Sequence, residues 1–251
     1  MIYFVGAGPG AADLITLRGD RLLREADVVI YAGSLVNPAL LEVTKPGCEI
    51  HDSASMTLEQ VIDAMVAAAG AGKLTVRLHT GDPSIYGAHR EQMDELDKHG
   101  LAYEVVPGVS SLNGAAAALR AEYTLPGVSQ TVIITRVEGR TPVPPKEQIA
   151  SLAAHGATMA VFLSSGLLDK LTAGLLEGGY DADCPAAIVY KATWPDEKVV
   201  RTTVSGLAEA AKAEGISKTA LILAGRFLGA EYDRSLLYHP GFTHGFREAA
   251  Q

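Results

Sequence analysis

Glycines whose spacing suits ligand binding come directly after the first apolar run of the chain. Gly6, Gly8 and Gly10 follow Ile2–Val5 in the segment Gly-Ala-Gly-Pro-Gly-Ala. This segment fits the loose glycine pattern that brings a backbone close to the pyrophosphate of a dinucleotide. A tight turn at the end of a strand explains the same glycines without any ligand. The pattern alone leaves both interpretations open.

Two features argue against a dinucleotide site. Pro9 has no N–H to offer a phosphate at the point where such a loop opens a helix. The acidic residue that holds a ribose should end the second strand, but that strand continues into Tyr31-Ala32-Gly33, and Asp27 comes ahead of it. We therefore expect no Rossmann-type site.

Later segments place polar side chains next to glycine turns. Asp82 follows Gly81, and its carboxylate suits either a ligand hydroxyl or ammonium group or an Asx turn ahead of Pro83. Both roles can hold at once. Ser110 and Ser111 suit a ligand contact, but a serine is also a good helix N-cap, which explains one of them without a ligand.

The elements that must position these loops follow an α/β pattern, because short β-branched runs alternate with helical periodicity. The clearest helix begins at Thr57, where Thr57 and Gln60 form a capping box, and it ends at Gly70. Other helices are expected around residues 17–23, 89–99, 110–120, 149–154, 167–175 and 207–213. Strands are expected at residues 2–5, 28–31, 74–78, 103–106, 130–135, 158–163, 186–190, 199–203 and 220–223.

A break in this alternation predicts two domains. Pro126-Gly127 interrupts the pattern within residues 122–129, which we take as a linker. An N-terminal α/β domain would then cover residues 1–121 and a C-terminal α/β domain residues 130–229. Residues 230–251 lose all periodicity, so we expect an irregular tail there.

Composition narrows the class of protein. The chain has 251 residues and a formal net charge of -8, which disfavours a surface built to hold nucleic acid or anionic lipid. Cys48 and Cys184 lack metal-ligand spacing, so we expect two unpaired thiols and no metal site. No apolar stretch approaches the length of a membrane span, and the first residues show no signal-peptide pattern. We expect a cytoplasmic protein.

Three loops together resemble those of the tetrapyrrole (corrin and porphyrin) methylases. Val5–Gly10, Arg77–Gly87 and Val106–Ser111 occur in the order and spacing of that family. Residues 158–163, 190–193 and 218–221 are similar to the family's C-terminal loops. The resemblance covers roughly residues 1–229.

Four further segments are similar to members that methylate precorrin-4 or cobalt-precorrin-4 at C11: residues 31–36, 52–57, 135–142 and 192–195. The chain departs from a common family form at two places. Leu163 stands where many members have Met, and Ser110-Ser111 stand where many have Thr-Ala. Both changes keep size and polarity close.

The resemblance implies two α/β domains with a ligand cleft between them, no Rossmann fold, and a homodimer. It implies S-adenosyl-L-methionine as methyl donor, S-adenosyl-L-homocysteine as product, and a small-molecule tetrapyrrole as acceptor, with precorrin-4 converted to precorrin-5 in cobalamin biosynthesis. Four of the implied donor contacts, Leu163, Ala192, Thr219 and Ala220, would come from the second domain. The others are Pro9, Thr80, Gly81, Asp82, Ile85, Ser110 and Ser111.

Methyl transfer from a sulfonium is an in-line displacement, which demands alignment and exclusion of water more than a dedicated base. We therefore assign no catalytic residue. Arg136 and Arg140 are candidates to pair with the carboxylates of the acceptor, although solvated loop arginines are about as common an outcome. His79 and Glu138 are candidates to assist proton loss, although a lone histidine or glutamate is more often structural or solvated.

Other acceptors stay open within the family: cobalt-precorrin-4, uroporphyrinogen III, precorrin-2 and precorrin-3. An RNA acceptor fits poorly with the net charge of -8. Outside the family, the alternative is a non-catalytic protein that binds NAD or FAD at Gly6–Gly10.

Overall fold

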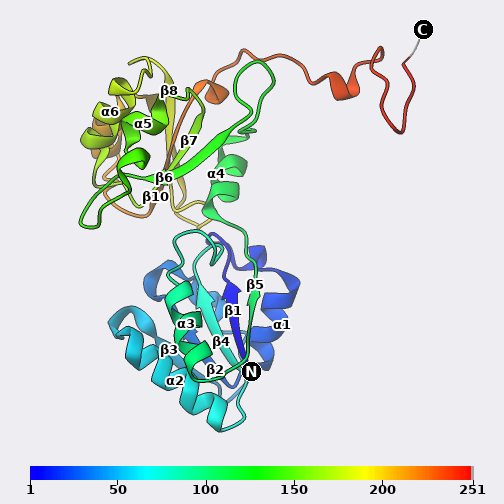
Figure 1. Cartoon of the computed structure of the whole chain (residues 1–251), viewed down its shortest axis with the longest axis vertical. Helices are drawn as coiled ribbons and strands as arrows, with labels where there is room; N and C mark the ends of the chain where they lie inside the picture. The colour runs from blue at the N-terminus through cyan, green and yellow to red at the C-terminus, as the bar shows by residue number, and fades with distance from the viewer. Residues whose placement is uncertain (250–251) are drawn as a thin grey trace. The chain divides into compact units, whose positions relative to one another are not determined.

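The computed structural model describes residues 1–249 and has the predicted α/β character, with two separate five-stranded sheets (Figure 1). The chain forms two compact units. Unit 1 contains Met1–Ala115 and Lys191–Glu197. Unit 2 contains Ala116–Tyr190 and the chain from Lys198 onward. The sequence-based linker at residues 122–129 thus lies within unit 2, and the division falls inside helix α4 (Ser111–Leu119).

The sheet of unit 1 is entirely parallel and has the strand order β3-β2-β4-β1-β5. Its central strands are short and buried on both faces, as expected when helices cover a parallel sheet on both sides, and the strand Thr75–His79 buries the polar residues Arg77 and His79 as well. The strands are β1 (Ile2–Gly6), β2 (Val28–Tyr31), β3 (Glu49–Asp52), β4 (Thr75–His79) and β5 (Tyr103–Val106).

Helices cover the two faces of this sheet. Helix α1 (Leu17–Glu25) follows β1 and buries Leu22 and Leu23 in the core on one face. Helices α2 (Leu58–Gly70) and α3 (Arg90–Lys98) lie on the other face, and α3 follows β4. Because the chain leaves neighbouring strands β1 and β4 toward opposite faces, a crevice is expected at their carboxyl ends.

The sheet of unit 2 is mixed, with the order β6-β7-β10-β8-β9; β6 and β7 are parallel and the other neighbours antiparallel. Its strands are β6 (Val132–Arg136), β7 (Thr158–Phe162), β8 (Pro185–Tyr190), β9 (Lys198–Thr203) and β10 (Ala220–Ala224). The helices α5 (Ile149–Ala153), α6 (Leu168–Glu177) and α7 (Leu207–Ala213) bury Leu171, Leu175 and Leu207 in one core with the sheet.

Short 3-10 helices occupy several connections: Ala12–Leu14, Gly33–Leu35, Pro38–Leu40, Ser53–Ser55, Pro145–Glu147, Arg226–Leu228 and Leu236–Tyr238. From residue 230 to 249, Leu236–Tyr238 is the only helix or strand in the described chain. None of the helices in residues 1–249 is long and apolar enough to cross a membrane.

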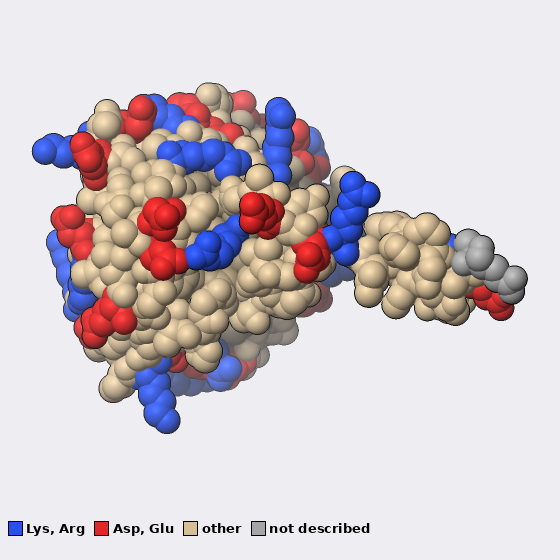
Figure 2. All heavy atoms as spheres, turned by 90° about the horizontal axis from the view of Figure 1, so that it is seen from above, with Lys and Arg blue, Asp and Glu red and all other residues tan. Residues whose placement is uncertain are grey.

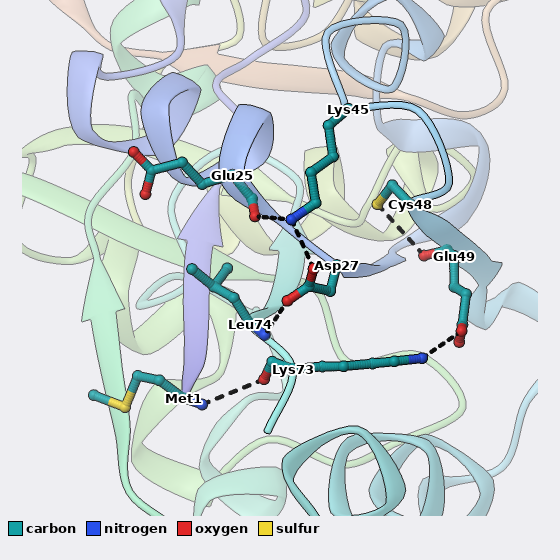
Figure 3. A network of polar contacts seen from close by, with 8 residues as sticks. All are labelled: Met1, Glu25, Asp27, Lys45, Cys48, Glu49, Lys73 and Leu74. Carbon is teal, nitrogen blue, oxygen red and sulfur yellow. Dashed lines mark hydrogen bonds and ion pairs between the residues drawn. The ribbon is translucent and has the colours of Figure 1, made fainter. Parts of the chain in front are cut away.

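A network of charged residues lies at the amino-terminal end of the first sheet (Figure 3). The Asp27 carboxylate accepts a hydrogen bond from Leu74 N–H at 2.7 Å and pairs with Lys45 Nζ at 2.6 Å. Lys73, just ahead of β4, pairs with Glu49, the first residue of β3. These ion pairs are largely exposed to solvent, so each contributes little to the stability of the fold. The network joins strand ends remote from the glycine loops.

Candidate active site

The loops that follow β1 and β4 are joined by backbone hydrogen bonds. Gly8 N–H donates to Gly81 O at 3.2 Å, and Gly81 N–H donates to Gly8 O at 2.9 Å. Ala7 N–H donates to His79 O at 2.7 Å. The two predicted ligand loops therefore form one surface at the crevice between β1 and β4.

The loop after β5 approaches the other two so closely that only glycine fits. A Cβ on Gly6 would lie 2.5 Å from Gly108 Cα and 2.7 Å from Gly81 O. A Cβ on Gly108 would overlap the Gly81 oxygen and lie 2.7 Å from Gly6 Cα. The three glycines form a junction, here called the glycine junction (Gly6, Gly81 and Gly108).

Asp82 fastens this junction. Its Oδ2 accepts a hydrogen bond from Gly108 N–H at 2.7 Å, and its Oδ1 accepts from Ser84 N–H at 2.8 Å and from the Ser84 hydroxyl. Partial burial alone would raise the pKa of the Asp82 carboxyl, but the bonds from Ser84 and Gly108 outweigh it and hold this pKa below its ordinary value. The expected Asx turn is present, and the ionised carboxylate ties two loops together.

The remaining predicted donor contacts of unit 1 differ in how their polar atoms are used. Thr80 Oγ1 is buried and has no hydrogen-bond partner in the described chain. Ser110 Oγ accepts from Leu112 N–H at 3.2 Å, so it caps α4, and Ser111 is the first residue of that helix. Ile85 is half-buried in the loop after β4. The Thr80 hydroxyl is thus a candidate to hydrogen-bond a ligand.

The backbone of the first loop is occupied in a way that excludes pyrophosphate binding. Gly8 N–H bonds to Gly81, and Ala11 N–H donates to Thr193 Oγ1 at 2.9 Å. Pro9 has no N–H. In residues 8–11, the Gly10 N–H alone has no partner among the described residues. A row of free N–H groups, which a dinucleotide phosphate needs, is absent from this loop.

The segment Lys191–Glu197 packs on this first loop. Trp194 Nε1 donates to Pro9 O at 3.1 Å, and a Cβ on Gly10 would lie 2.5 Å from Trp194 Nε1. Ala192 is buried beside Gly10 and Gly114. The expectation that Ala192 contributes from the second domain was therefore wrong, since these contacts hold it in unit 1.

Leu163, Thr219 and Ala220 lie in unit 2. Because β7 and β10 are antiparallel, the end of β7 lies beside the start of β10, and Ser165 Oγ donates to Ala220 O at 3.1 Å there. Leu163 has φ 52° and is 68% exposed, and Thr219 has φ 57°. The other non-glycine residues with positive φ are Tyr86, Ala88, Arg120, Lys191 and Thr193. Such strain gathers at functional loops, and most of these residues adjoin predicted donor contacts.

Comparison with known proteins decides the family. Residues 1–208 match the family model described as Tetrapyrrole (Corrin/Porphyrin) Methylases. The chain belongs to the tetrapyrrole methylase family.

Similar methylases match along nearly their whole length. The chain is 55% identical to a cobalt-precorrin-4 C(11)-methyltransferase of Methanocaldococcus jannaschii, over 99% of this chain and 96% of the relative. It is 46% identical to a precorrin-4 C(11)-methyltransferase of Mycobacterium tuberculosis, over 94% and 95%.

Two solved structures of methylases agree with the fold. An X-ray structure of a cobalt precorrin-4 methyltransferase, described as a cobalamin biosynthetic enzyme, superposes with a TM-score of 0.90 at 51% identity, covering 91% of this chain and 96% of that one. A uroporphyrin-III C-methyltransferase of Thermus thermophilus complexed with S-adenosyl homocysteine gives 0.74 at 29% identity, covering 91% and 93%. The expectation of a methylase-type rather than Rossmann fold is confirmed.

The His79 side chain is buried in unit 1. It is 3% exposed, with ring centroids 5.9 Å from Phe4 and 6.0 Å from His89. Burial, the positive charge of Arg77 and the neighbouring His89 lower the pKa of His79 to about 3. An enclosed, neutral imidazole fits the structural alternative for His79 better than a role in proton loss.

Unit 2 contains three of the polar residues predicted to contact the acceptor, and two of them already have partners within that unit. Arg136 donates to Pro142 O at 2.7 Å and to Thr141 O at 3.2 Å, so its guanidinium fastens that loop. Glu138 accepts from Gln148 and lies 3.6 Å from Lys170 Nζ. Arg140 is exposed and makes no hydrogen bond or ion pair in the described chain, which leaves its guanidinium available for a carboxylate.

Sequence reasoning missed the role of Trp194. The segment Ala192–Pro195 stood out as similar to part of the family, but a contact with the first loop has no local signature, because about 180 residues separate the partners. Among residues 1–249, no group of three or more His, Cys, Asp or Glu side chains is arranged to hold a metal ion.

Proposed function

We propose that this methylase transfers a methyl group from S-adenosyl-L-methionine to C11 of the precorrin-4 macrocycle in cobalamin biosynthesis. The observation that carries the proposal is the near-complete structural match, at 51% identity, to a cobalt precorrin-4 methyltransferase. Named C(11)-methyltransferases that span the same length agree with it.

The donor site in this proposal is the surface built around the glycine junction. The residues present suit an amino acid and a nucleoside, because the free Thr80 hydroxyl and the Gly10 N–H offer hydrogen bonds. A relative with 29% identity is complexed with S-adenosyl homocysteine. The proposed contacts are Pro9, Thr80, Gly81, Asp82, Ile85, Ser110, Ser111 and Ala192. Leu163, Thr219 and Ala220 stay predictions.

The chemistry asks little of the protein beyond position. The donor supplies a methyl group on a sulfonium whose leaving group is a neutral thioether. The loops of unit 1 would hold it in one orientation, and their many internal hydrogen bonds make that orientation rigid. An electron-rich macrocycle carbon can act as the nucleophile, so we assign no base. Arg140 is the proposed partner of an acceptor carboxylate.

The cobalt-loaded acceptor is the form that the relatives favour. Identity is 55% to a cobalt-precorrin-4 enzyme and 46% to a precorrin-4 enzyme, over almost equal lengths. The resemblance in the sequence implied metal-free precorrin-4, whereas these identities favour cobalt-precorrin-4 as the acceptor.

The face of the molecule in Figure 2 gives no support to an RNA acceptor. Figure 2 shows Lys and Arg interspersed with Asp and Glu over the face in view, without a broad basic patch.

The proposal also includes a homodimer in the cytoplasm. The molar mass of the protein, measured by light scattering as it elutes from a size-exclusion column, tests the dimer.

The test is an assay of the acceptor's mass. The purified protein is incubated with S-adenosyl-L-methionine and cobalt-precorrin-4, with precorrin-4 and uroporphyrinogen III in parallel. We expect one added methyl group on the precorrin-4 forms, at C11 by NMR, and none on uroporphyrinogen III. Methylation of uroporphyrinogen III alone would contradict the assigned step.

Two glycine variants make matched controls for this assay. Gly108→Ala places a Cβ against the Gly81 oxygen and should abolish turnover. Gly70→Ala has open space around its Cβ and should keep it.

A further inference from the structure

The segment Lys191–Glu197, here called the strap, is set apart by where it packs. It connects β8 to β9, which are both strands of unit 2, yet its own contacts place it in unit 1. The strap makes two hydrogen bonds to the loop Gly8–Ala11. Trp194 Nε1 donates to Pro9 O at 3.1 Å, and Thr193 Oγ1 accepts from Ala11 N–H at 2.9 Å.

The strap is itself held in a strained conformation. Thr193 has φ 69°, a left-handed value that a β-branched residue rarely adopts. Its N–H donates to Glu197 Oε2 at 2.6 Å. Lys191 Nζ pairs with Asp196 at 2.6 Å and lies 5.5 Å from the centre of the Trp194 ring. Strain of this kind persists only where surrounding contacts fix it, and it marks sites where position matters.

These contacts leave the gripped loop with one open hydrogen-bond donor. The N–H and the C=O of Gly8 both form hydrogen bonds with Gly81, and Asn37 Nδ2 donates to Gly10 O at 2.8 Å. With Pro9 O and Ala11 N–H taken by the strap, only the Gly10 N–H lacks a partner among the described residues. Gly10 also has no room for a side chain, because the Trp194 indole fills that space.

We infer that Trp194 and Thr193 are positioning residues for the methyl donor: they fix Pro9 and Gly10 so that the loop is preformed for binding. The inference rests on the proposed function, since it takes Pro9 as a donor contact. When the loop is already ordered, donor binding does not have to offset the conformational entropy lost on ordering the loop. Loss of the strap contacts should therefore lower donor affinity and leave the rate of methyl transfer unchanged.

The test uses the full-length protein and S-adenosyl-L-homocysteine. Trp194→Phe keeps a ring over Gly10 and removes the N–H, and Thr193→Val removes the hydroxyl at nearly constant volume. Each should weaken S-adenosyl-L-homocysteine binding by about threefold to tenfold in calorimetry, the range of one neutral hydrogen bond. Thr193→Ser keeps the hydroxyl and should bind within about twofold of the unmodified protein.

Kinetics and a core variant separate positioning from stability. In the strap variants the KM for S-adenosyl-L-methionine should rise with binding, while kcat at saturating donor and the KM for the tetrapyrrole change less than about twofold. Ile62→Val thins the core beneath α2, far from the strap, and lowers stability without touching the loop. Its donor affinity should equal that of the unmodified protein.

Three outcomes overturn the inference. If Trp194→Phe and Thr193→Val bind S-adenosyl-L-homocysteine as tightly as the unmodified protein, the strap does not position the donor. If Ile62→Val loses the same affinity, the effect reflects stability. If the unmodified protein itself fails to bind S-adenosyl-L-homocysteine, the proposed function falls and the inference falls with it.

Trp194 also supplies a direct signal, because it is the only tryptophan in the chain. Donor binding at the loop that it grips should change its fluorescence during a titration, with the same midpoint as the calorimetric curve.

Discussion

At the scale of single residues, the candidate site depends on ordinary groups put to structural use. Asp82 was expected to contact a ligand, to form an Asx turn, or to do both; its two oxygens form the turn with Ser84 and accept from Gly108 of another loop. The Arg136 guanidinium donates hydrogen bonds to carbonyl oxygens of the loop that follows it. These residues shape the loops, and the groups left available for ligands are few, chiefly Thr80 Oγ1, the Gly10 N–H and Arg140.

His79 makes the stability of the fold depend on pH. Its pKa of about 3 in the folded state lies below its ordinary value of 6.5, so the unfolded chain binds the extra proton as the pH falls below 6.5. Stability from this residue is therefore full above pH 6.5 and declines toward pH 3. Between pH 6.5 and 4.5 the loss should amount to roughly 3 kcal/mol at most.

Urea unfolding at pH 7 and pH 4.5 measures this loss. We expect His79→Gln to lose less stability over that interval than the unmodified protein, because glutamine takes up no proton. His155→Gln, which replaces an exposed histidine, should keep the full dependence. An identical loss in His79→Gln and the unmodified protein would show that His79 is not the group responsible.

At the scale of elements, the sequence was most informative where a local signal decides the structure. The strands at residues 28–31 and 103–106 and the helix at 207–213 have the predicted bounds. The edge strand β3 was missed, since Glu49–Asp52 is short and carries two acidic residues. The strap was missed as a contact because its partners are distant in the chain. The sequence left the burial of His79 undecided, because which side chains of β4 are covered depends on which helices pack on each face.

The capping box of α2 is a local signal whose energy can be measured. Thr57 Oγ1 accepts from Gln60 N–H at 3.3 Å, and Gln60 Oε1 accepts from Thr57 N–H at 2.9 Å. Thr57→Ala should lower the free energy of unfolding by about 1 kcal/mol in denaturant titrations, and Thr57→Ser should not. Because the two bonds are reciprocal, Gln60→Ala should cost less in the Thr57→Ala background than alone. Equal costs in both backgrounds would mean that the box does not act as a unit.

At the scale of the whole molecule, ligand binding and unfolding are linked, which allows a decision between a methylase and a dinucleotide-binding protein. S-Adenosyl-L-homocysteine at about 100 times its Kd should stabilise the protein by about 2.7 kcal/mol, visible as a higher Tm. NAD and FAD at the same concentrations should leave the Tm unchanged, because the first loop has no row of free N–H groups. Stabilisation by NAD without any by S-adenosyl-L-homocysteine would contradict the proposed donor.

The strap has a consequence for how such enzymes can exchange parts during evolution. Residues 191–197 serve the first unit but are encoded inside the second. A single genetic crossover between two family members near residue 115 would therefore join one parent's glycine loop to the other parent's strap. Such hybrids should function only where both parents carry a compatible pair at the loop and at Thr193-Trp194. A double crossover that moves residues 191–197 together with residues 1–115 would keep the matching pair intact.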